Sequence, residues 1–343
     1  ICGDADGSGA VNLLDVSYVI RFLYMGGVTP NPIKAADVDN SNKINLLDIS
    51  YTINFLYRGG PKPRCSDYLG QIPADSAAVI FAPGLISTSN LEGACTADPG
   101  FTEFYYGLGP DIYFVKKTGN IWSDPTIASF SSSEFSEYEP FMTPDGQKML
   151  FASSRTPVTN YIWCVDRTES GWSEPNPLGG VFSGIKMMYP TMSSNGNLYY
   201  QDITNYPTSA PIYVSKFVAG EYQAPIMLDA NINGTGYSHH PFIAPDESYM
   251  IFADYRTDSY GDWDLYLSFR KPDDTWTMPL NLGGYINSSL SDIQPYVTGD
   301  GKYFFFSRYN GTTGDIYWCN TSFIDKLKKG IPKIAFYSGR YAP

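Results

Sequence analysis

The first 60 residues alternate between polar loops and amphipathic segments. After each loop, apolar residues recur at the i, i+3, i+4, i+7 spacing of one helix face, which predicts two helices. Glycine pairs, Gly26-Gly27 and Gly59-Gly60, are expected to end them. The apolar stripes consist of Val16, Val19, Ile20 and Leu23 in the first helix, and of Ile49, Ile53 and Leu56 in the second.

Each predicted helix also has a second apolar stripe on another face. A module of about 65 residues is too small to bury both faces of two helices. One stripe is therefore expected to pair the helices, and the other to meet another protein or the rest of this chain. The predicted partner-binding residues are Leu14, Tyr18, Phe22, Leu47, Tyr51 and Phe55.

The two polar loops are copies of one another, because segments 3–27 and 36–60 align throughout. In both copies, oxygen-bearing side chains stand at loop positions 1, 3, 5, 9 and 12, and position 7 can supply its backbone carbonyl. An EF-hand loop uses this spacing to surround a hard cation, so we predict two bound Ca²⁺ ions. The predicted ligands are Asp4, Asp6, Ser8, the Ala10 carbonyl, Asn12 and Asp15, and then Asp37, Asp39, Ser41, the Lys43 carbonyl, Asn45 and Asp48.

Loop position 6 needs a positive φ, which Gly9 adopts freely and Asn42 tolerates. With Asp at position 12, the duplicated segment resembles dockerin type I repeats over residues 1–65. That resemblance implies a secreted, calcium-folded module that docks onto cohesin domains in bacterial surface assemblies. Cellulosomal dockerins typically carry a Ser-Thr pair at positions 10 and 11, whereas this chain has Leu13-Leu14 and Leu46-Leu47. The leucines favour an apolar interface.

Beyond residue 66, short apolar runs separated by Asp/Asn-Gly-like turns predict β-hairpins. The hairpins recur at a fixed interval, and each is followed by further strand-like runs, which predicts a β-propeller rather than an open sandwich. Five blades fit the repeat, and segments 68–95 and 333–341 are then expected to pair with each other and close the ring. The alternative is that these two segments form a sixth blade. The predicted hairpin turns are at Asp98, Asp145, Asn195, Asp246 and Asp300.

These repeats resemble the TolB-type, WD-like propeller repeat, P-D-G-x…F-x-S-x-R…D-I-Y, over about residues 75–335. The expected fold class is therefore mainly β, with a five-bladed propeller at 67–343. An all-α, calcium-loop module at 1–66 precedes it. The resemblance implies little about function, because such propellers bind many kinds of ligand.

In four hairpins, the residue before a proline is predicted to start the innermost strand and to face the central channel. By repeat symmetry, Glu139, Tyr189, His240 and Gln294 ring one channel mouth, with His239 beside them. Two interpretations follow: the side chains converge on a metal or substrate, or they hydrogen-bond neighbouring blades. The second is favoured, since the chain has only two histidines.

Charge and cysteines refine this picture. The formal net charge is −12, which argues against nucleic-acid binding. No apolar run is long enough to span a membrane. Because the chain starts at Ile1 rather than Met, we expect a processed, exported protein or a fragment. A Cys2–Cys65 disulfide is predicted, which suits an exported protein, and the other cysteines are expected to be buried thiols. These are Cys95, Cys164 and Cys319, and the candidate glycosylation sequons start at Asn233, Asn287, Asn310 and Asn320.

Together these features indicate a secreted or cell-surface, calcium-dependent assembly or adhesion protein. Its dockerin-like module would dock onto a cohesin-like protein, or onto another copy of the chain to build a fibre or scaffold, with the propeller as binding platform. No catalytic residue is predicted. The alternative is a dockerin-borne polysaccharide lyase or glycosidase with its site at the channel mouth.

Overall fold

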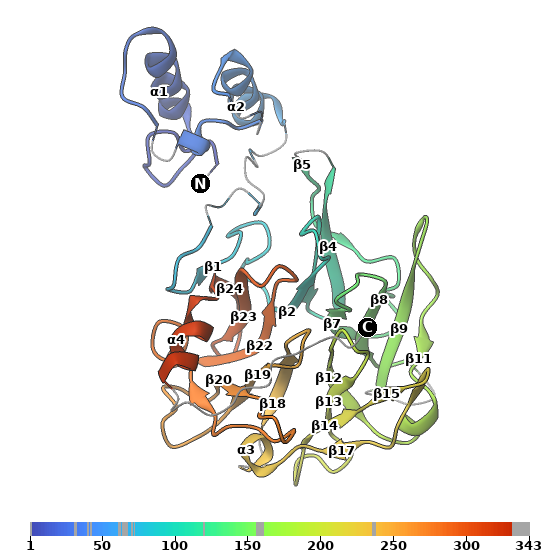
Figure 1. The fold of residues 1–343 in the computed structure, drawn as a ribbon. Coiled ribbons are helices and arrows are strands. Elements are labelled where there is room, and N and C mark those ends of the chain that lie inside the picture. Colours follow the sequence, from blue (N-terminus) through green and yellow to red (C-terminus); the bar gives the residue numbers. More distant parts are fainter. Residues whose placement is uncertain are drawn as a thin grey trace. The chain divides into compact units, whose positions relative to one another are not determined.

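The computed structural model describes residues 2–330 except 31–32, 40, 42, 61–62, 64–67, 70, 72, 119–120, 156–160 and 235–237. The chain divides into two compact units (Figure 1). The first comprises Ile1–Pro73 with Val115–Asp124, and the second Ala74–Phe114 with Pro125–Pro343. Three predicted features, Asn42, Cys65 and the 333–341 segment, lie outside the described residues.

The helices of the first unit are α1 (Leu13–Tyr24) and α2 (Leu46–Arg58), joined through a short 3₁₀ turn at Ile33–Ala35. Each begins where an asparagine side chain accepts a hydrogen bond from a helix N–H, Asn12 from Leu14 and Asn45 from Leu47. In α2, Gly59 ends the helix with a φ of 68°. The sequence therefore predicted both helices and their ends by local rules.

One apolar stripe pairs the two helices, as predicted. The buried core of this unit consists of Ala5, Val16, Val19, Ala36 and Ile49. Leu23, Ile53 and Leu56 pack against it, but Ile20 does not and is exposed. The prediction for Ile20 was wrong, because this side chain is 37% exposed and takes no part in the helix-pairing core.

The second unit is a five-bladed propeller, and the sixth-blade alternative is wrong. Its five innermost strands contact one another in a closed ring, in the order β2, β7, β12, β18, β22 and back to β2. From the inside outward, blade 1 is β2 (Glu92–Ala97), β3 (Glu103–Leu108) and β4 (Asp111–Thr118), with β6 (Thr126–Ile127) on β4. The end of β4 and its partner β5 (Ile121–Trp122) are the part of this sheet that falls in the first unit. Blade 2 is β7 (Glu137–Met142), β8 (Lys148–Ser153), β9 (Tyr161–Thr168) and β10 (Gly171–Trp172), with β11 (Asn176–Pro177) also on β9.

The remaining blades have the same order. Blade 3 is β12 (Met187–Met192), β13 (Leu198–Asp202), β14 (Ile212–Ser215) and β17 (Ile226–Met227), beside a small hairpin of β15 (Phe217–Val218) and β16 (Glu221–Tyr222). Blade 4 is β18 (His239–Ile243), β19 (Tyr249–Asp254), β20 (Asp264–Phe269) and β21 (Leu280–Asn281). Blade 5 is β22 (Ser291–Val297), β23 (Tyr303–Tyr309), β24 (Gly314–Asn320) and β1 (Val79–Ile80). Two short helices complete the unit, α3 (Ala230–Asn233) and α4 (Ser322–Gly330).

The ring closes through a strand from the start of this unit. β1 pairs antiparallel with β24, with Val79 opposite Trp318, and so supplies the outermost strand of the last blade. This closure explains why an early segment of the unit is needed to complete the fifth blade. The prediction that a strand from segment 68–95 helps to close the ring is confirmed. The strand with which it pairs is β24.

Buried ion pairs between an acid and an arginine recur inside three blades. Arg155 pairs with Glu137, Arg256 with Asp254 and Arg308 with Asp292, at N···O distances of 2.8, 2.8 and 2.7 Å. Each arginine also donates to a carbonyl of a preceding loop, that of Phe130, Asn231 or Ile286. The acids that these arginines bind lie on the first or second strand of their blades.

The cysteines follow the predictions in part. Cys2 is disulfide-bonded, and its predicted partner, Cys65, lies outside the described residues. The thiols of Cys95 and Cys319 are buried, as expected. Cys164, on β9, is only half-buried, so the expectation for it was wrong.

Candidate functional sites

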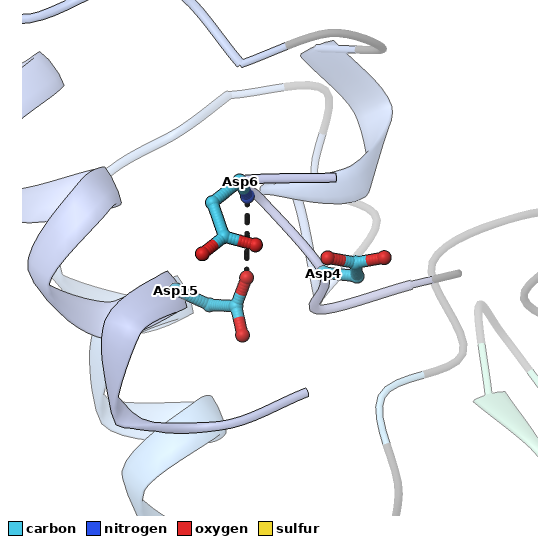
Figure 2. Close-up of side chains that lie close together, drawn as sticks. All are labelled: Asp4, Asp6 and Asp15. Atoms are coloured by element: carbon cyan, nitrogen blue, oxygen red, sulfur yellow. Dashed lines mark hydrogen bonds between the residues drawn. The ribbon is translucent and has the colours of Figure 1, made fainter. Parts of the chain in front are cut away.

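The acids of the first loop converge at the start of α1. Carboxylate oxygens of Asp4, Asp6 and Asp15 all lie within 4.8 Å of one another. Figure 2 shows Asp6 facing Asp15, whose Oδ1 accepts a hydrogen bond from the Asp6 N–H at 3.2 Å, with Asp4 alongside. Such a cluster of hard oxygen donors suits Ca²⁺.

Loop folding positions the other predicted ligands around the carboxylates. Ser8 donates to the Ala10 carbonyl at 3.3 Å, and so does the Asn12 side chain. Gly9 has a φ of 90°, the conformation expected of position 6, and its N–H donates to Asp4 Oδ2 at 2.9 Å. The oxygen of the Asn12 side chain caps α1, so Asn12 contributes to the helix as well as to the loop.

The second loop repeats this arrangement. Oxygens of Asp37, Asp39 and Asp48 also lie within 4.8 Å of one another. Ser41 donates from its hydroxyl to the Lys43 carbonyl at 3.2 Å, and the Asn45 side chain donates to the same carbonyl at 3.5 Å. Two loops with the same geometry thus arise from two copies of one sequence.

Electrostatics make these clusters costly without a cation. Burial raises the pKa of Asp15 and of Asp48, and the neighbouring carboxylates raise both further. The pKa of Asp6 is lowered because Ser8 donates hydrogen bonds to its carboxylate. A divalent ion would remove the mutual repulsion of the three carboxylates, so the residues of both loops fit Ca²⁺.

Comparison with known proteins identifies this segment. Residues 2–57 match the dockerin type I domain family. They form a dockerin type I domain. Dockerin type I domains bind calcium and cohesin partners, and they occur in extracellular or cell-surface proteins. None of the helices in the described part of the chain has the length and hydropathy of a membrane-spanning segment.

The propeller has structural relatives but no curated match. An endo-arabinase from Bacteroides thetaiotaomicron VPI-5482 aligns with a TM-score of 0.50 and 14% identity, over 68% of this chain and 95% of that one. A TolB-like protein from Agrobacterium tumefaciens aligns with a TM-score of 0.47 and 14% identity, over 68% of this chain and 78% of that one. TolB from Acinetobacter baumannii aligns with a TM-score of 0.45 and 14% identity, over 68% of this chain but only 55% of its own length. At this identity the likeness shows the fold alone. No match was found among curated proteins.

The dockerin domain exposes leucine pairs where its helices begin. Leu14 and Leu47 are 65% and 64% exposed, and their neighbours Leu13 and Leu46 are exposed too. The other four predicted partner-binding residues are half-buried. Tyr18 packs against the helix-pairing core, and Tyr51 packs against Cys2 and Val38, so this stripe is not a continuous free face.

Five residues with positive φ ring the propeller channel, one from the innermost strand of each blade. The sequence predicted that such residues start the innermost strand. In the structure each lies inside its strand, at a β-bulge. The ring consists of Ala94, Glu139, Tyr189, His240 and Gln294. Repeat reasoning missed Ala94 because no proline follows it. His239 lies outside the ring, with its imidazole 4.4 Å from the Trp263 ring.

Part of the ring is occupied by contacts between blades. The Glu139 carboxylate accepts a hydrogen bond from the Tyr189 N–H at 2.8 Å, and the Gln294 side chain accepts one from the Ala94 N–H at 2.8 Å. Burial raises the pKa of Glu139 to about 8 and lowers the pKa of His239 to about 4. The pKa of His240 is held well below its usual value by burial and by His239, so this imidazole is neutral.

A cavity of about 380 Å³ opens on one side of the ring. Glu139, Tyr189, His240 and Gln294 all line it, so the structure brings together four of the five predicted channel residues. Glu92 also lines the cavity, although no sequence motif surrounds this acid and marks it in advance. On the other side of the ring the space narrows to about 40 Å³.

The four sequon asparagines have different environments. Asn233 and Asn287 use their side-chain amides to bind the backbone of Ile212 and Leu265, respectively, where a third strand begins. Asn320 is half-buried and donates to Asp75 at 3.1 Å. Asn310 is exposed in a loop and is the sequon asparagine that a glycan reaches most easily.

Proposed function

We propose that this protein is a secreted or cell-surface assembly subunit whose dockerin domain binds two Ca²⁺ ions and docks onto a cohesin-like protein. The proposed ligands are the six positions of each loop described above. The observation that carries the proposal is the placement of the exposed leucines. Leu13 and Leu14 stand between Asn12 and Asp15, so the groups that bind the ion also position the docking residues.

The docking surface is apolar and duplicated. Leu13 and Leu14 on α1 correspond to Leu46 and Leu47 on α2, and no charged side chain interrupts either pair. Removing apolar area of this kind from water contributes about 25 cal/mol per Å², and only the part that exceeds the entropy lost on association appears as affinity. Self-association into a fibre or scaffold is the other way to cover these leucines, and the propeller would then be a binding platform in the assembly.

The test compares complexes formed with and without calcium. We expect full-length protein to bind a panel of immobilised cohesin domains in Ca²⁺ and to lose binding in EGTA. The variant with Leu13→Ser, Leu14→Thr, Leu46→Ser and Leu47→Thr should fold in Ca²⁺ but bind at least ten-fold more weakly. A matched control replaces the exposed helix residues Ser17 and Ser50 by alanine. Calcium-dependent oligomers that need the leucines, seen by light scattering, would assign self-association instead; unchanged binding in the leucine variant would refute the docking surface.

A polysaccharide-acting enzyme is the second candidate, favoured by the channel-mouth cavity with its buried Glu139 and by the fold shared with an endo-arabinase. In such an enzyme, Glu139, with its raised pKa, would serve as a general acid. Release of reducing ends from arabinan or polygalacturonate, abolished by Glu139→Gln, would establish this activity. No release from a panel of plant polysaccharides would remove the candidate.

Among the four sequons, we propose Asn310 as the glycosylation site. Glycosylation of Asn233 or Asn287 would remove the amide hydrogen bonds that hold the start of a strand. Mass spectrometry of the secreted protein would locate any glycan.

A further inference from the structure

The strongest unexplained feature is a set of buried polar atoms around the channel-mouth cavity. Glu92 Oε2, Ser307 Oγ and His240 Nδ1 are each buried, and none has a hydrogen-bond partner among the described residues. All three residues line the cavity of about 380 Å³. Buried polar atoms in folded proteins are nearly always paired with protein, ordered water or a ligand, so three unpaired ones around one cavity show that polar partners belong in this space.

Comparison of the blades shows what Glu92 lacks. Glu92 begins β2 just as Glu137 begins β7, and it corresponds to Asp292 on β22. Glu137 pairs with Arg155, and Asp292 pairs with Arg308, which stands directly opposite on β23. The residue opposite Glu92 is Leu108. Glu92 is only 1% exposed, so blade 1 buries the acid of this clamp without its guanidinium.

The lining of the cavity has acceptors but no basic side chain. Glu92 and Glu139 contribute carboxyl groups, and no lysine or arginine is among the lining residues that the structure describes. The neutral His240 and Ser307 can each accept a hydrogen bond and also donate one. An anionic ligand would face the Glu92 carboxylate with no lysine or arginine on the described lining to offset it, whereas an ammonium or guanidinium group carries donors alone and suits the unpaired Glu92 Oε2.

Small residues in blade 1 create the space. Gly93 and Gly107 face each other across β2 and β3, where blade 2 has Tyr138 opposite Ala152. Ala94 takes the ring position that larger side chains occupy in the other blades. The resulting volume lies within the range of small-molecule sites, about 300–1,000 Å³. Tyr138, Tyr189 and Tyr309 also line the cavity, and aromatic faces attract organic cations.

A metal ion explains the cavity less well. Within the described part of the chain, the only groups of three converging His, Cys, Asp or Glu side chains are the two in the dockerin loops. Glu92, Glu139 and His240 therefore do not form a converging group of three ligands. The volume is also far larger than a single ion needs.

We propose that the channel mouth of the propeller binds a small organic cation, with its guanidinium or ammonium group on Glu92, in the place that an arginine fills in blades 2 and 5. This site is independent of the docking function and lies wholly within the propeller unit. It competes with the polysaccharide-enzyme candidate, because that candidate requires a neutral or acidic sugar in the same cavity.

The test is calorimetric titration of the full-length protein in 150 mM NaCl, which suppresses nonspecific attraction of cations to an acidic surface. The ligands are agmatine, which carries a guanidinium and an ammonium, arabinotriose, which is neutral, and galacturonate, which is anionic. We expect saturable 1:1 binding of agmatine only. Glu92→Gln should weaken it at least ten-fold, and Glu169→Gln, at an exposed turn, should leave it unchanged.

A second variant guards against misfolding. Leu108→Arg places a guanidinium opposite Glu92, as Arg308 stands opposite Asp292, so it should abolish agmatine binding and raise the Tm of the propeller. Binding of agmatine that persists in both variants would place the cation elsewhere and overturn the proposal. Binding of arabinotriose or galacturonate but not of agmatine would also overturn the proposal and would favour the enzyme candidate. Absence of binding by all three ligands would overturn the proposal as well.

Discussion

Asp15 Oδ2 accepts a hydrogen bond from the Asn12 N–H at 2.7 Å, so the carboxylate that we propose as the last calcium ligand of the first loop also caps α1. Asp48 and Asn45 repeat the arrangement on α2 at 2.8 Å. Each helix therefore starts at its proposed ion site. Because the same carboxylate serves both, binding of the ion and stability of the helix are expected to be linked.

Substitutions of Asp15 should separate the two roles. Asp15→Asn keeps an acceptor for the Asn12 N–H but removes the charge, so calcium affinity should fall at least ten-fold while the isolated cap is largely retained. Asp15→Ala should lose both the calcium ligand and the cap. Loss of the cap should lower the free energy of unfolding by about 1 kcal/mol more. Calorimetric calcium titration together with circular dichroism would measure the two effects. Equal calcium affinity in wild type and Asp15→Asn would contradict the proposed ligand.

Chelation should act on the dockerin domain alone. Without Ca²⁺, repulsion among the carboxylates of each loop is uncompensated, so amide protons of α1 and α2 should lose protection against hydrogen exchange. Protection of the innermost propeller strands should not change in EGTA, and these strands serve as the internal control. Undiminished protection of both helices in EGTA would show that calcium does not order this domain.

The stability of the propeller should depend on pH through Glu139. Burial raises its pKa from 4.5 to about 8, so the folded state holds this proton more tightly than the unfolded state. The resulting contribution to stability is complete below pH 4.5 and is lost as the pH rises toward 8. Glu139→Gln, which keeps an acceptor for the Tyr189 N–H, should remove this dependence and give a higher Tm than wild type at pH 8. Parallel Tm profiles from pH 4.5 to 8 would contradict the assignment; Glu169→Gln is the control.

Buried and exposed ion pairs of blade 5 should differ in energy. Arg308→Gln leaves the fully buried Asp292 without its cation and should destabilise the propeller by about 3–5 kcal/mol. Lys302→Gln breaks an exposed pair with Asp300 and should cost about 1 kcal/mol or less. Chemical denaturation of the two variants measures the contrast. Similar losses in both would mean that the Arg308 clamp does not stabilise the blade.

Asn287 should be a structural residue rather than a glycosylation site. Its side chain binds both the N–H and the carbonyl of Leu265, at 2.9 and 3.0 Å, so Asn287→Ala leaves buried backbone groups unpaired. We expect a loss of about 1–3 kcal/mol in the free energy of unfolding. Asn310→Asp, which removes an exposed sequon but keeps the oxygens that cap its turn, should be close to wild type. A stable Asn287→Ala protein would refute this role.

The sequence by itself determined the features that depend on local spacing. Both loops, both helices and their caps follow from residues within one turn of each other, since a helix and its cap need only near neighbours. Likewise, the five blades follow from a repeat in which each hairpin turn is marked by its own Asp or Asn. Local rules of this kind placed the dockerin domain and predicted the propeller.

Only the tertiary structure decided which side chains remain without a partner. Tyr18 and Tyr51 share a helical stripe with Leu14 and Leu47, but packing against the core covers the tyrosines and leaves the leucines exposed. In the same way, Glu92 became conspicuous only once Leu108 was found opposite it. Periodicity reports which face a residue lies on; what covers that face depends on strands and helices distant in the sequence, and their register is set by the packing of the whole unit.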